Sequence, residues 1–564
     1  MVDVDVITQE VIGARLNGIV SEMQVAIFRT GFSTIIRETH DFSCALLDWQ
    51  GRLVGSHSSV VGHNGAYPYC VAGVLEFYDY EDMKEGDSFV INSAYHSGVP
   101  HPMDIVVVTP IFYEGSLVAF CASIGHKSDI GGLAPGSRVT LARDVYGEGL
   151  QILPVRFQRD YQIIKETEQF FRGNSRSPHL VLGDLTAQAG ALWSIGGERL
   201  IALMDQFGKE VVESTFDLLG KRTEQRLRRE LEEWPDGVFE GETFIRDVVD
   251  SSRTIRLHVA AIKEGDRLIM DFSATGDQSE GPVNIRPPFL RGISTSSLTA
   301  MVDPSIPNNW GSQGVIDYRF RSGSLVDPIY PGPTGFYSKN LRAIEGIVNR
   351  AMTKASGRPA VSFGGTQSSM VLGSRGASAR PYVQYEIFNP GSYAFEGGDG
   401  WPGTGHGFSG SSRFTSIEIL EAEFDVRLLQ FAVTPDTGGA GKFRGGSSYR
   451  RDYLLKGSAK FTGGADRRVA QGTEGGMDGV VGAVVINPGT PQEQRHETMV
   501  SSVELAPGDV VRIEAPAGGG VGDPKERERE RVIHDVEDGI VSSQNAIDLY
   551  GMSQRELQEA GLGA

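Results

Sequence analysis

The sequence has 564 residues, 40% of them hydrophobic and 22% charged, and a formal net charge of −19 at pH 7. This acidic balance disfavours nucleic acid as a partner, because it repels phosphate backbones. Three scattered cysteines are too few for a disulfide framework or a cysteine-based zinc site. Neither a secretory signal nor an apolar run near about 18 residues is recognised. We therefore expect a globular cytoplasmic protein without a membrane partner.

The first expected element is a long helix near the N-terminus. Apolar residues recur there at steps of three and four and share one face: Ile12, Leu16, Ile19, Met23 and Ile27. We expect Thr8 to cap its start and Gly31 to end it. Strand-like runs follow from residue 42, and residues 160–230 return to helical spacing.

The second half of the chain is expected to be mostly β-structure. From about Pro235, segments alternate like strands joined by Gly, Asp and Asn turns, with one helix near residues 340–355. Glycine supplies 72 residues, which is typical of many turns and loops. Ser553 and Glu556 form a capping-box pattern near the C-terminus. The prediction is an α+β, multidomain chain with a mixed N-terminal region (1–234), a β-rich, glycine-rich region (235–524) and a helical tail (525–564).

Two nucleotide-like motifs lack the context that they require. Gly405, Gly407 and Gly410 spell G-x-G-x-x-G, but a dinucleotide fingerprint follows a strand and opens a helix. Here the motif follows a Trp-Pro-Gly turn. The Gly441-Lys442 pair lacks both the first glycine and the Ser/Thr of a P-loop. We expect no nucleotide site at either motif.

A β-hairpin is predicted between residues 104 and 126. Two apolar, strand-length runs flank a Glu-Gly turn. Regular pairing leaves Asp104 one position short of His126. A bulge near Pro110, which cannot donate a ladder hydrogen bond, would bring them opposite each other. Since His101 lies just before the first strand, three polar side chains converge at the open end of the hairpin.

Two imidazoles and one carboxylate can hold a divalent cation and leave coordination positions open. Such an ion lowers the pKa of a bound water or polarises a carbonyl. In the alternative interpretation, His101 and His126 are ordinary hydrogen-bonding residues at strand ends, while Asp104 and Asp129 form turns. The residues alone leave both interpretations open.

Motifs in a fixed order along nearly the whole chain carry a family resemblance. They lie at residues 22–23, 33–46, 62–65, 101–104, 125–132, 271–273, 281–284, 306–311, 418, 421, 436–439, 444–446 and 515–524. In these motifs the chain resembles the B-type subunits of the hydantoinase/oxoprolinase family. That family includes the beta subunits of N-methylhydantoinase and caprolactamase. It is similar also to the metal-binding subunits of acetone and acetophenone carboxylases. Two departures are Asn92-Ser93-Ala94 in place of the usual Asn-Asp-Pro, and Lys127 where a second histidine often follows.

The resemblance implies that His101, Asp104 and His126 bind a divalent metal (Zn, Mn or Fe). It also implies an A-type partner subunit that binds ATP and phosphorylates the substrate, in a hetero-oligomer of the α2β2 kind. The implied activity is ATP-dependent hydrolysis of a cyclic amide, such as hydantoin, oxoproline or another lactam. The division of labour is chemically sensible, because an O-phosphorylated imidate is a better electrophile than a lactam.

Four further positions that match the family are candidates for catalytic or supporting roles. Glu38 and Asp41 could orient ligands or transfer protons, or form an exposed turn pair. His63, in a glycine-flanked loop, could reach the site or remain an exposed histidine. Asp129 could hydrogen-bond a ligand histidine or cap the Ile-Gly-Gly turn that follows it.

Two other functions stay open at this point. A ketone carboxylase would use the metal to hold an enolate and carbon dioxide derived from bicarbonate. A structural subunit would only organise its partner. A non-haem iron oxygenase also uses two histidines and one carboxylate, but the family resemblance argues against it. Labelled bicarbonate entering the product would distinguish the carboxylase. Turnover that survives loss of the ligands would favour the structural role.

Overall fold

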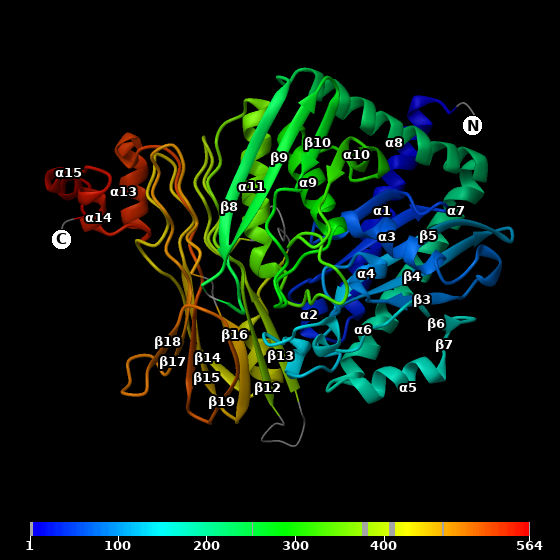
Figure 1. Ribbon diagram of the computed structural model, residues 1–564, viewed down its shortest axis with the longest axis horizontal. Coiled ribbons are helices and arrows are strands. Elements are labelled where there is room, and N and C mark those ends of the chain that lie inside the picture. The colour runs from blue at the N-terminus through cyan, green and yellow to red at the C-terminus, as the bar shows by residue number, and fades with distance from the viewer. Residues whose placement is uncertain (1–3, 251, 375–381, 405–411, 465–466, 563–564) are drawn as a thin grey trace. The chain divides into compact units, whose positions relative to one another are not determined.

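The computed structural model describes residues 4–250, 252–374, 382–404, 412–464 and 467–562 (Figure 1). Helices and several sheets are mixed along the chain, which confirms the predicted α+β class. The described residues form two compact units. Unit 1 lies within residues 1–239, 246–337 and 407–413, and unit 2 within 240–245, 338–406 and 414–564. The three-part division at residues 234 and 524 stays a prediction.

Unit 1 combines helices with two sheets. Its helices are α1 (Val6–Thr30), α2 (Thr34–Arg37), α3 (His63–Leu75), α4 (Ala94–Ser97), α5 (Lys165–Asn174), α6 (Pro178–Ala191), α7 (Glu198–Phe207), α8 (Lys209–Glu232), α9 (Pro287–Val302) and α10 (Trp310–Gln313). Shorter turns are η1 (Tyr80–Asp82), η2 (Pro135–Ser137) and η3 (Val145–Glu148), and a π-helical segment, η4 (Leu192–Gly197), joins α6 to α7.

The larger sheet of unit 1 has seven strands in the order β2-β1-β5-β4-β3-β6-β7. Its strands are β1 (Phe42–Asp48), β2 (Leu53–Ser58), β3 (Ser88–Ile91), β4 (Asp104–Tyr113), β5 (Ser116–His126), β6 (Val155–Arg159) and β7 (Gln162–Ile163). In the smaller sheet, β9 (Thr254–Glu264) pairs antiparallel with β10 (Arg267–Asp271), which pairs parallel with β11 (Ile316–Arg319). Strand β8 (Gly237–Arg246) has residues in both units.

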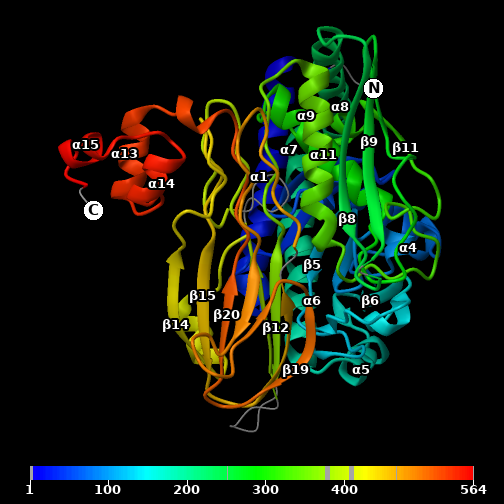
Figure 2. The same cartoon turned by 60° about the vertical axis from the view of Figure 1, so that its left-hand side comes forward.

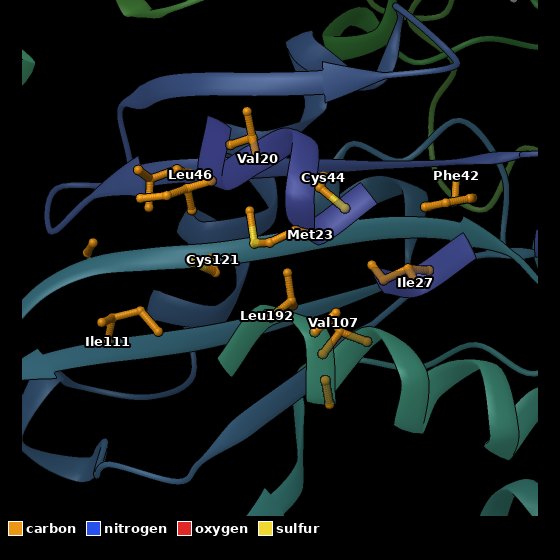
Figure 3. Packing of buried hydrophobic residues seen from close by; sticks show 14 of the residues in the cluster. Val20, Met23, Ile27, Phe42, Cys44, Leu46, Val107, Ile111, Cys121 and Leu192 are labelled. Atoms are coloured by element: carbon orange, nitrogen blue, oxygen red, sulfur yellow. The ribbon is translucent and has the colours of Figure 1, made fainter. Parts of the chain in front are cut away.

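The seven-stranded sheet is buried on both faces, because successive side chains of its central strands join two different apolar clusters. Cys44 and Cys121 join the cluster built on α1, α6, η4 and α7, whereas Phe120 joins the cluster built on α3. Figure 3 shows Met23 of α1 beside Cys121. A Cβ at Gly196 of η4 would lie 2.5 Å from the Met23 sulfur and 2.6 Å from the Cys121 sulfur, so a larger residue there would have to displace these side chains. This alternation decides which strand residues face α3.

Helix α1 confirms the predicted face and corrects the predicted cap. All five predicted apolar residues are buried, and Gly31 ends the helix. The start is capped by Asp5, whose carboxylate accepts from the Thr8 N–H at 3.0 Å, so the prediction of Thr8 as the cap was wrong. By length and composition α1 also passes the test for a membrane span, which the sequence had not indicated. Core helices pass the same test, and α1 buries its apolar face in unit 1.

Unit 2 is built on two antiparallel sheets (Figure 2). One has the order β13-β12-β16-β19, with β12 (Ser368–Ser374), β13 (Tyr382–Phe388), β16 (Ala459–Gly464) and β19 (Val500–Leu505). The other has the order β14-β15-β20-β17-β18, with β14 (Val426–Val433), β15 (Tyr449–Leu455), β17 (Ala483–Ile486), β18 (Gln494–His496) and β20 (Val510–Glu514). Met370 and Phe461 of the first sheet share one core with Tyr453 and Val511 of the second, as in a sandwich.

The helices of unit 2 are α11 (Ser338–Ser356), α12 (Ile417–Glu423), η5 (Pro524–Glu526), α13 (Arg529–Glu537), α14 (Ser543–Asp548) and α15 (Gln554–Glu559). Helix α11 confirms the helix expected near 340–355, and the capping box of Ser553 and Glu556 is formed. The G-x-G-x-x-G motif at Gly405, Gly407 and Gly410 lies outside the described residues.

Candidate metal centre

The open end of the β4–β5 hairpin positions Asp104 directly opposite His126. The register starts at the pair Tyr113 and Ser116 and shifts once, between Ile111 and Phe112. The predicted pairing is therefore confirmed, with the irregularity one residue beyond Pro110. Side chains alternate between the two faces of a strand, and the buried residues of β4 and β5 that face α3 stand at even-numbered positions. Asp104 and His126 are also at even-numbered positions. Both side chains consequently point to the α3 side of the sheet.

His101 lies in the loop before β4, and two anchors hold it. Asn92 donates its amide to the carbonyl oxygens of Pro102 and Leu150, at 2.7 and 2.8 Å, which fixes the loop. The ring of His101 lies 3.1 Å from the Gly335 carbonyl oxygen through Nδ1. A carbonyl only accepts, so Nδ1 carries the hydrogen and Nε2 keeps its lone pair. The lone pair faces the two strand residues.

The three polar side chains form a nearly equilateral triangle of potential ligand atoms. Asp104 Oδ1 lies 3.1 Å from His101 Nε2 and 3.2 Å from His126 Nδ1, and the two ring nitrogens lie 3.2 Å apart. Two nitrogens that close to each other and to a carboxylate oxygen are stable around a shared proton or cation. All three residues are buried.

The triangle fits a divalent transition metal. Three ligand atoms about 2.1 Å from one ion lie about 3.0 Å apart in octahedral geometry and about 3.4 Å apart in tetrahedral geometry. The observed edges of 3.1 to 3.2 Å fall between these values. Imidazole and carboxylate together suit Zn, Mn or Fe. The residues present can therefore hold the ion that the family resemblance implies.

The electrostatics of the cluster favour the ligand forms of its members. Burial alone would raise the pKa of Asp104, but His101, His126 and His63 outweigh it and hold that pKa well below its usual range. Burial lowers the pKa of His126, which favours the neutral ring. An ionised carboxylate and neutral imidazoles are the states that bind a metal.

Two predicted catalytic residues lie beside the triangle. His63 begins α3, rather than lying in a loop, and its Nε2 is 3.5 Å from Asp104 Oδ2. Gly65 allows this end of α3 to approach α9, because a Cβ there would lie 2.1 Å from the Pro288 carbonyl oxygen. Asp41 precedes β1, and its carboxylate lies 3.9 Å from His126 Nδ1. Burial raises the pKa of Asp41, against the attraction of His126.

The other two predicted catalytic residues have different surroundings. Asp129 accepts from the backbone N–H groups of Gly131, Gly136 and Arg176, and pairs with the Arg176 guanidinium at 3.0 Å. Of its two predicted roles, these contacts match the turn. Glu38 ends α2, and its backbone N–H donates to the Thr34 carbonyl. A catalytic role for Glu38 stays a prediction.

Sequence reasoning missed several residues that support the cluster. Ser43 on β1 contacts the second nitrogen of His63. Glu148 accepts from the backbone N–H groups of Thr334 and Gly335, next to the carbonyl that holds His101. The parity of β1 could have indicated Ser43, since Asp41 and Ser43 alternate onto the same face. No local pattern joins residue 148 to residues 334–335.

An α+β protein with two imidazoles and a carboxylate buried together at the end of a β-hairpin is a candidate metalloprotein. The sequence matches the family described as hydantoinase B/oxoprolinase over residues 5–524, and the chain belongs to this family.

Relatives agree with that assignment along the whole chain. The caprolactamase subunit beta of Pseudomonas jessenii is 27% identical, over 97% of this chain and 96% of its own. The 5-oxoprolinase of Saccharomyces cerevisiae is 27% identical over 93% of this chain, but the match covers only 42% of that longer protein.

Solved structures share the fold. The ATP-dependent caprolactamase from Pseudomonas jessenii aligns with a TM-score of 0.87 and 25% identity, over 98% of this chain and 96% of the other. An acetone carboxylase in a nucleotide-free structure aligns with a TM-score of 0.85 over 97% of this chain and 79% of the other. At 17% identity, the second comparison establishes the fold alone.

Proposed function

We propose that this chain is the metal-binding subunit of an ATP-dependent enzyme that hydrolyses cyclic amides, such as hydantoins, oxoproline or other lactams. The observation that carries the proposal is the buried triangle of His101, Asp104 and His126. It occurs in a chain that aligns end to end with a caprolactamase subunit beta.

The three residues of the triangle would hold the ion, which polarises a carbonyl-type oxygen and activates water. Gly335 orients His101 through its carbonyl group. His63 Nε2 lies 3.5 Å from Asp104 Oδ2, and the Asp41 carboxylate lies 3.9 Å from His126 Nδ1. Both residues would exchange protons or hydrogen bonds with a reacting molecule. Since the cluster is buried, bulk water is excluded and its charges act in a medium of low dielectric.

The proposal includes an A-type partner subunit that binds ATP. The caprolactamase relative is named as a subunit. In the yeast 5-oxoprolinase, the matching region is less than half of one longer chain, so further protein accompanies it there. We infer that a separate partner supplies this part here, phosphorylates the substrate and passes it to the metal centre. An assembly of the α2β2 kind and a cytoplasmic location belong to the same proposal.

The test has two steps. Metal content of the purified chain is compared with that of His101→Ala, and metal loss is expected in the variant. The chain is then combined with its co-purifying partner and assayed with ATP against a panel of hydantoins and lactams. Metal content that is unchanged in His101→Ala would remove the basis of the proposal.

A ketone carboxylase is the second candidate, favoured by the fold shared with acetone carboxylase. In this case the complex would incorporate labelled bicarbonate into a ketone in the presence of ATP. Ring opening without incorporation of label would exclude it.

A further inference from the structure

A hydrogen-bond chain of buried side chains runs from α3 through β1 and back to α3, beside the metal centre. The Tyr67 hydroxyl lies 2.6 Å from Ser43 Oγ, which lies 2.8 Å from His63 Nδ1. Tyr67 and His63 are one helical turn apart on α3, and Ser43 faces them from the sheet. All three side chains are buried.

The tyrosine determines which group donates in each hydrogen bond of this series. Burial raises the pKa of Tyr67 well above its usual value, so the phenol keeps its proton. Within the described part of the polypeptide, Ser43 Oγ is the acceptor within hydrogen-bond distance of this hydroxyl. Tyr67 therefore donates to Ser43, and Ser43 donates its own hydrogen to His63 Nδ1. A neutral imidazole that accepts at Nδ1 carries its hydrogen at Nε2.

The other end of the chain reaches the metal centre. His63 Nε2 is buried, and among the described residues it makes no hydrogen bond of ordinary geometry. Its nearest charged group is Asp104 Oδ2, at 3.5 Å. At 3.5 Å this contact is longer than an ordinary N–H···O hydrogen bond, so the buried Nε2–H is only weakly satisfied, and such donors in native proteins call for an explanation. A ligand that brings its own acceptor provides one.

We propose that His63 is a hydrogen-bond donor and not a metal ligand. Its Nε2–H binds an anionic oxygen of the substrate beside the ion, and Ser43 and Tyr67 are positioning residues that fix this tautomer. The substrate part of this inference rests on the proposed function, whereas the tautomer rests on the hydrogen-bond chain alone. A nitrogen that carries a hydrogen has no lone pair for a metal, so the two roles of His63 exclude each other.

The first experiment separates donor from ligand with the metal alone as the probe. Zn²⁺ is titrated into the full-length wild-type chain, His63→Gln and His101→Ala. Glutamine keeps an N–H near the position of Nε2 but is a poor transition-metal ligand. We expect His63→Gln to change the metal dissociation constant by less than about tenfold, and His101→Ala to raise it more than about 100-fold. Equal losses in both variants would identify His63 as a ligand and overturn the proposal.

The second experiment reads the tautomer directly and needs no metal. In the chain with ¹⁵N-labelled histidines, the His63 resonances are assigned by their absence in His63→Gln. We expect the Nε2–H pattern in the wild type and its loss or mixing in Ser43→Ala. The matched control is Ser123→Ala, because the buried Ser123 hydroxyl donates to the Ser43 backbone carbonyl and not to His63.

A Nδ1–H pattern in the wild type would overturn the proposal whatever the metal titration gives. Conversely, a wild-type chain that binds no metal but shows the Nε2–H pattern would overturn the proposed function and leave the direction of the hydrogen-bond chain standing.

Discussion

Each unit buries a cluster of charged residues, and the two clusters differ in how they are neutralised. In unit 2, Glu386 accepts from Arg451 at 2.7 Å, from the Tyr453 hydroxyl at 3.0 Å and from Gln384 at 2.6 Å. The Arg451 guanidinium also lies over the ring of Phe431. This carboxylate is matched by a permanent cation and needs no ligand.

The cluster of unit 1 has no such cation within the triangle. Its carboxylate meets ring nitrogens, one of which keeps its lone pair because His101 donates elsewhere through Nδ1. The comparison teaches that burial of charge alone does not indicate a site. The indication comes from potential ligand atoms that converge on one point without an Arg or Lys side chain, among the described residues, to neutralise the carboxylate.

The largest effect is expected when the carboxylate of the unit 1 cluster, Asp104, is replaced. Asp104→Asn removes the anionic group of the proposed metal site. We expect metal affinity to fall more than about 1,000-fold, since loss of even the outer partners of metal ligands costs about 10–100-fold. Metal-dependent turnover should be lost with it. Metal content after dialysis measures the first effect, and assay of the complex measures the second.

Asp129→Asn is the matched control for that variant. Asp129 is equally buried and lies near the same hairpin end, but its contacts are backbone groups and Arg176. We expect it to lower the stability of the fold while metal affinity stays within about tenfold of the wild type. Full metal binding by Asp104→Asn, or a loss in Asp129→Asn as large as that expected for Asp104→Asn, would contradict the assignment.

The complementary substitution in unit 2 is Arg451→Ala. It leaves Glu386 buried without its cation, and we expect the free energy of unfolding to fall by about 3–5 kcal/mol. Denaturant melts of this chain measure the loss. Metal content should remain that of the wild type, which is the opposite of the Asp104→Asn result.

A double variant tests whether Glu386 is destabilising only when it lacks its cation. Combining Arg451→Met with Glu386→Leu removes both charges, and such replacements are often neutral or stabilising. We expect it to recover most of the stability lost in Arg451→Ala. If the double variant is no more stable than Arg451→Ala, the Arg451–Glu386 pair contributes to stability by more than the neutralisation of each charge by the other, and the expectation is wrong.

The next prediction concerns Gly65, which allows the end of α3 that carries His63 to approach α9. Gly65→Ala places a Cβ 2.1 Å from the Pro288 carbonyl oxygen, so α3 and α9 must separate. We expect a loss of about 1–3 kcal/mol in stability, as for other overpacked sites. Gly18→Ala on α1 is the control, because no atom lies within 4 Å of its Cβ position. It should be neutral or stabilising by about 0.5–1 kcal/mol, and thermal melts that rank the two in reverse order would contradict the packing.

Local patterns were sufficient for much of unit 1. The spacing of apolar residues predicted α1, and the turn and Pro110 predicted a hairpin with one irregularity, which together place Asp104 opposite His126. A cap is decided by a single hydrogen bond, and the spacing of apolar residues did not indicate that Asp5, rather than Thr8, accepts it.

Contacts between distant segments could not be predicted in the same way. His101 and Gly335 are 234 positions apart, and nothing in either segment specifies the other. His63 was expected in a loop, because its flanking glycines are typical of loops. The structure uses those glycines for the close approach of α3 to α9. That requirement is visible only when both helices are in place.

The smallest expected effect, taken over a single pH unit, concerns the carboxylate that holds the Gly335 segment. Burial raises the pKa of Glu148 to about 8, so the folded chain holds a proton there that the unfolded chain loses near its ordinary pKa of 4.5. The folded state then binds more protons between these values, and the stability that this group contributes falls as pH rises from about 4.5 to about 8. One proton corresponds to at most about 1.4 kcal/mol per pH unit.

Glu148→Gln removes this titration and keeps the size of the side chain. Relative to the variant, the wild type should therefore lose about 1 kcal/mol of stability between pH 6 and pH 7, measured by denaturant melts at each pH with a chelator present. The two pH profiles should run parallel below about pH 4.5, where the carboxyl is protonated in both states of the wild type. Parallel profiles between pH 6 and pH 8 would show that Glu148 is ionised in the folded chain. Two backbone N–H groups would then hold an anion beside the segment that orients His101.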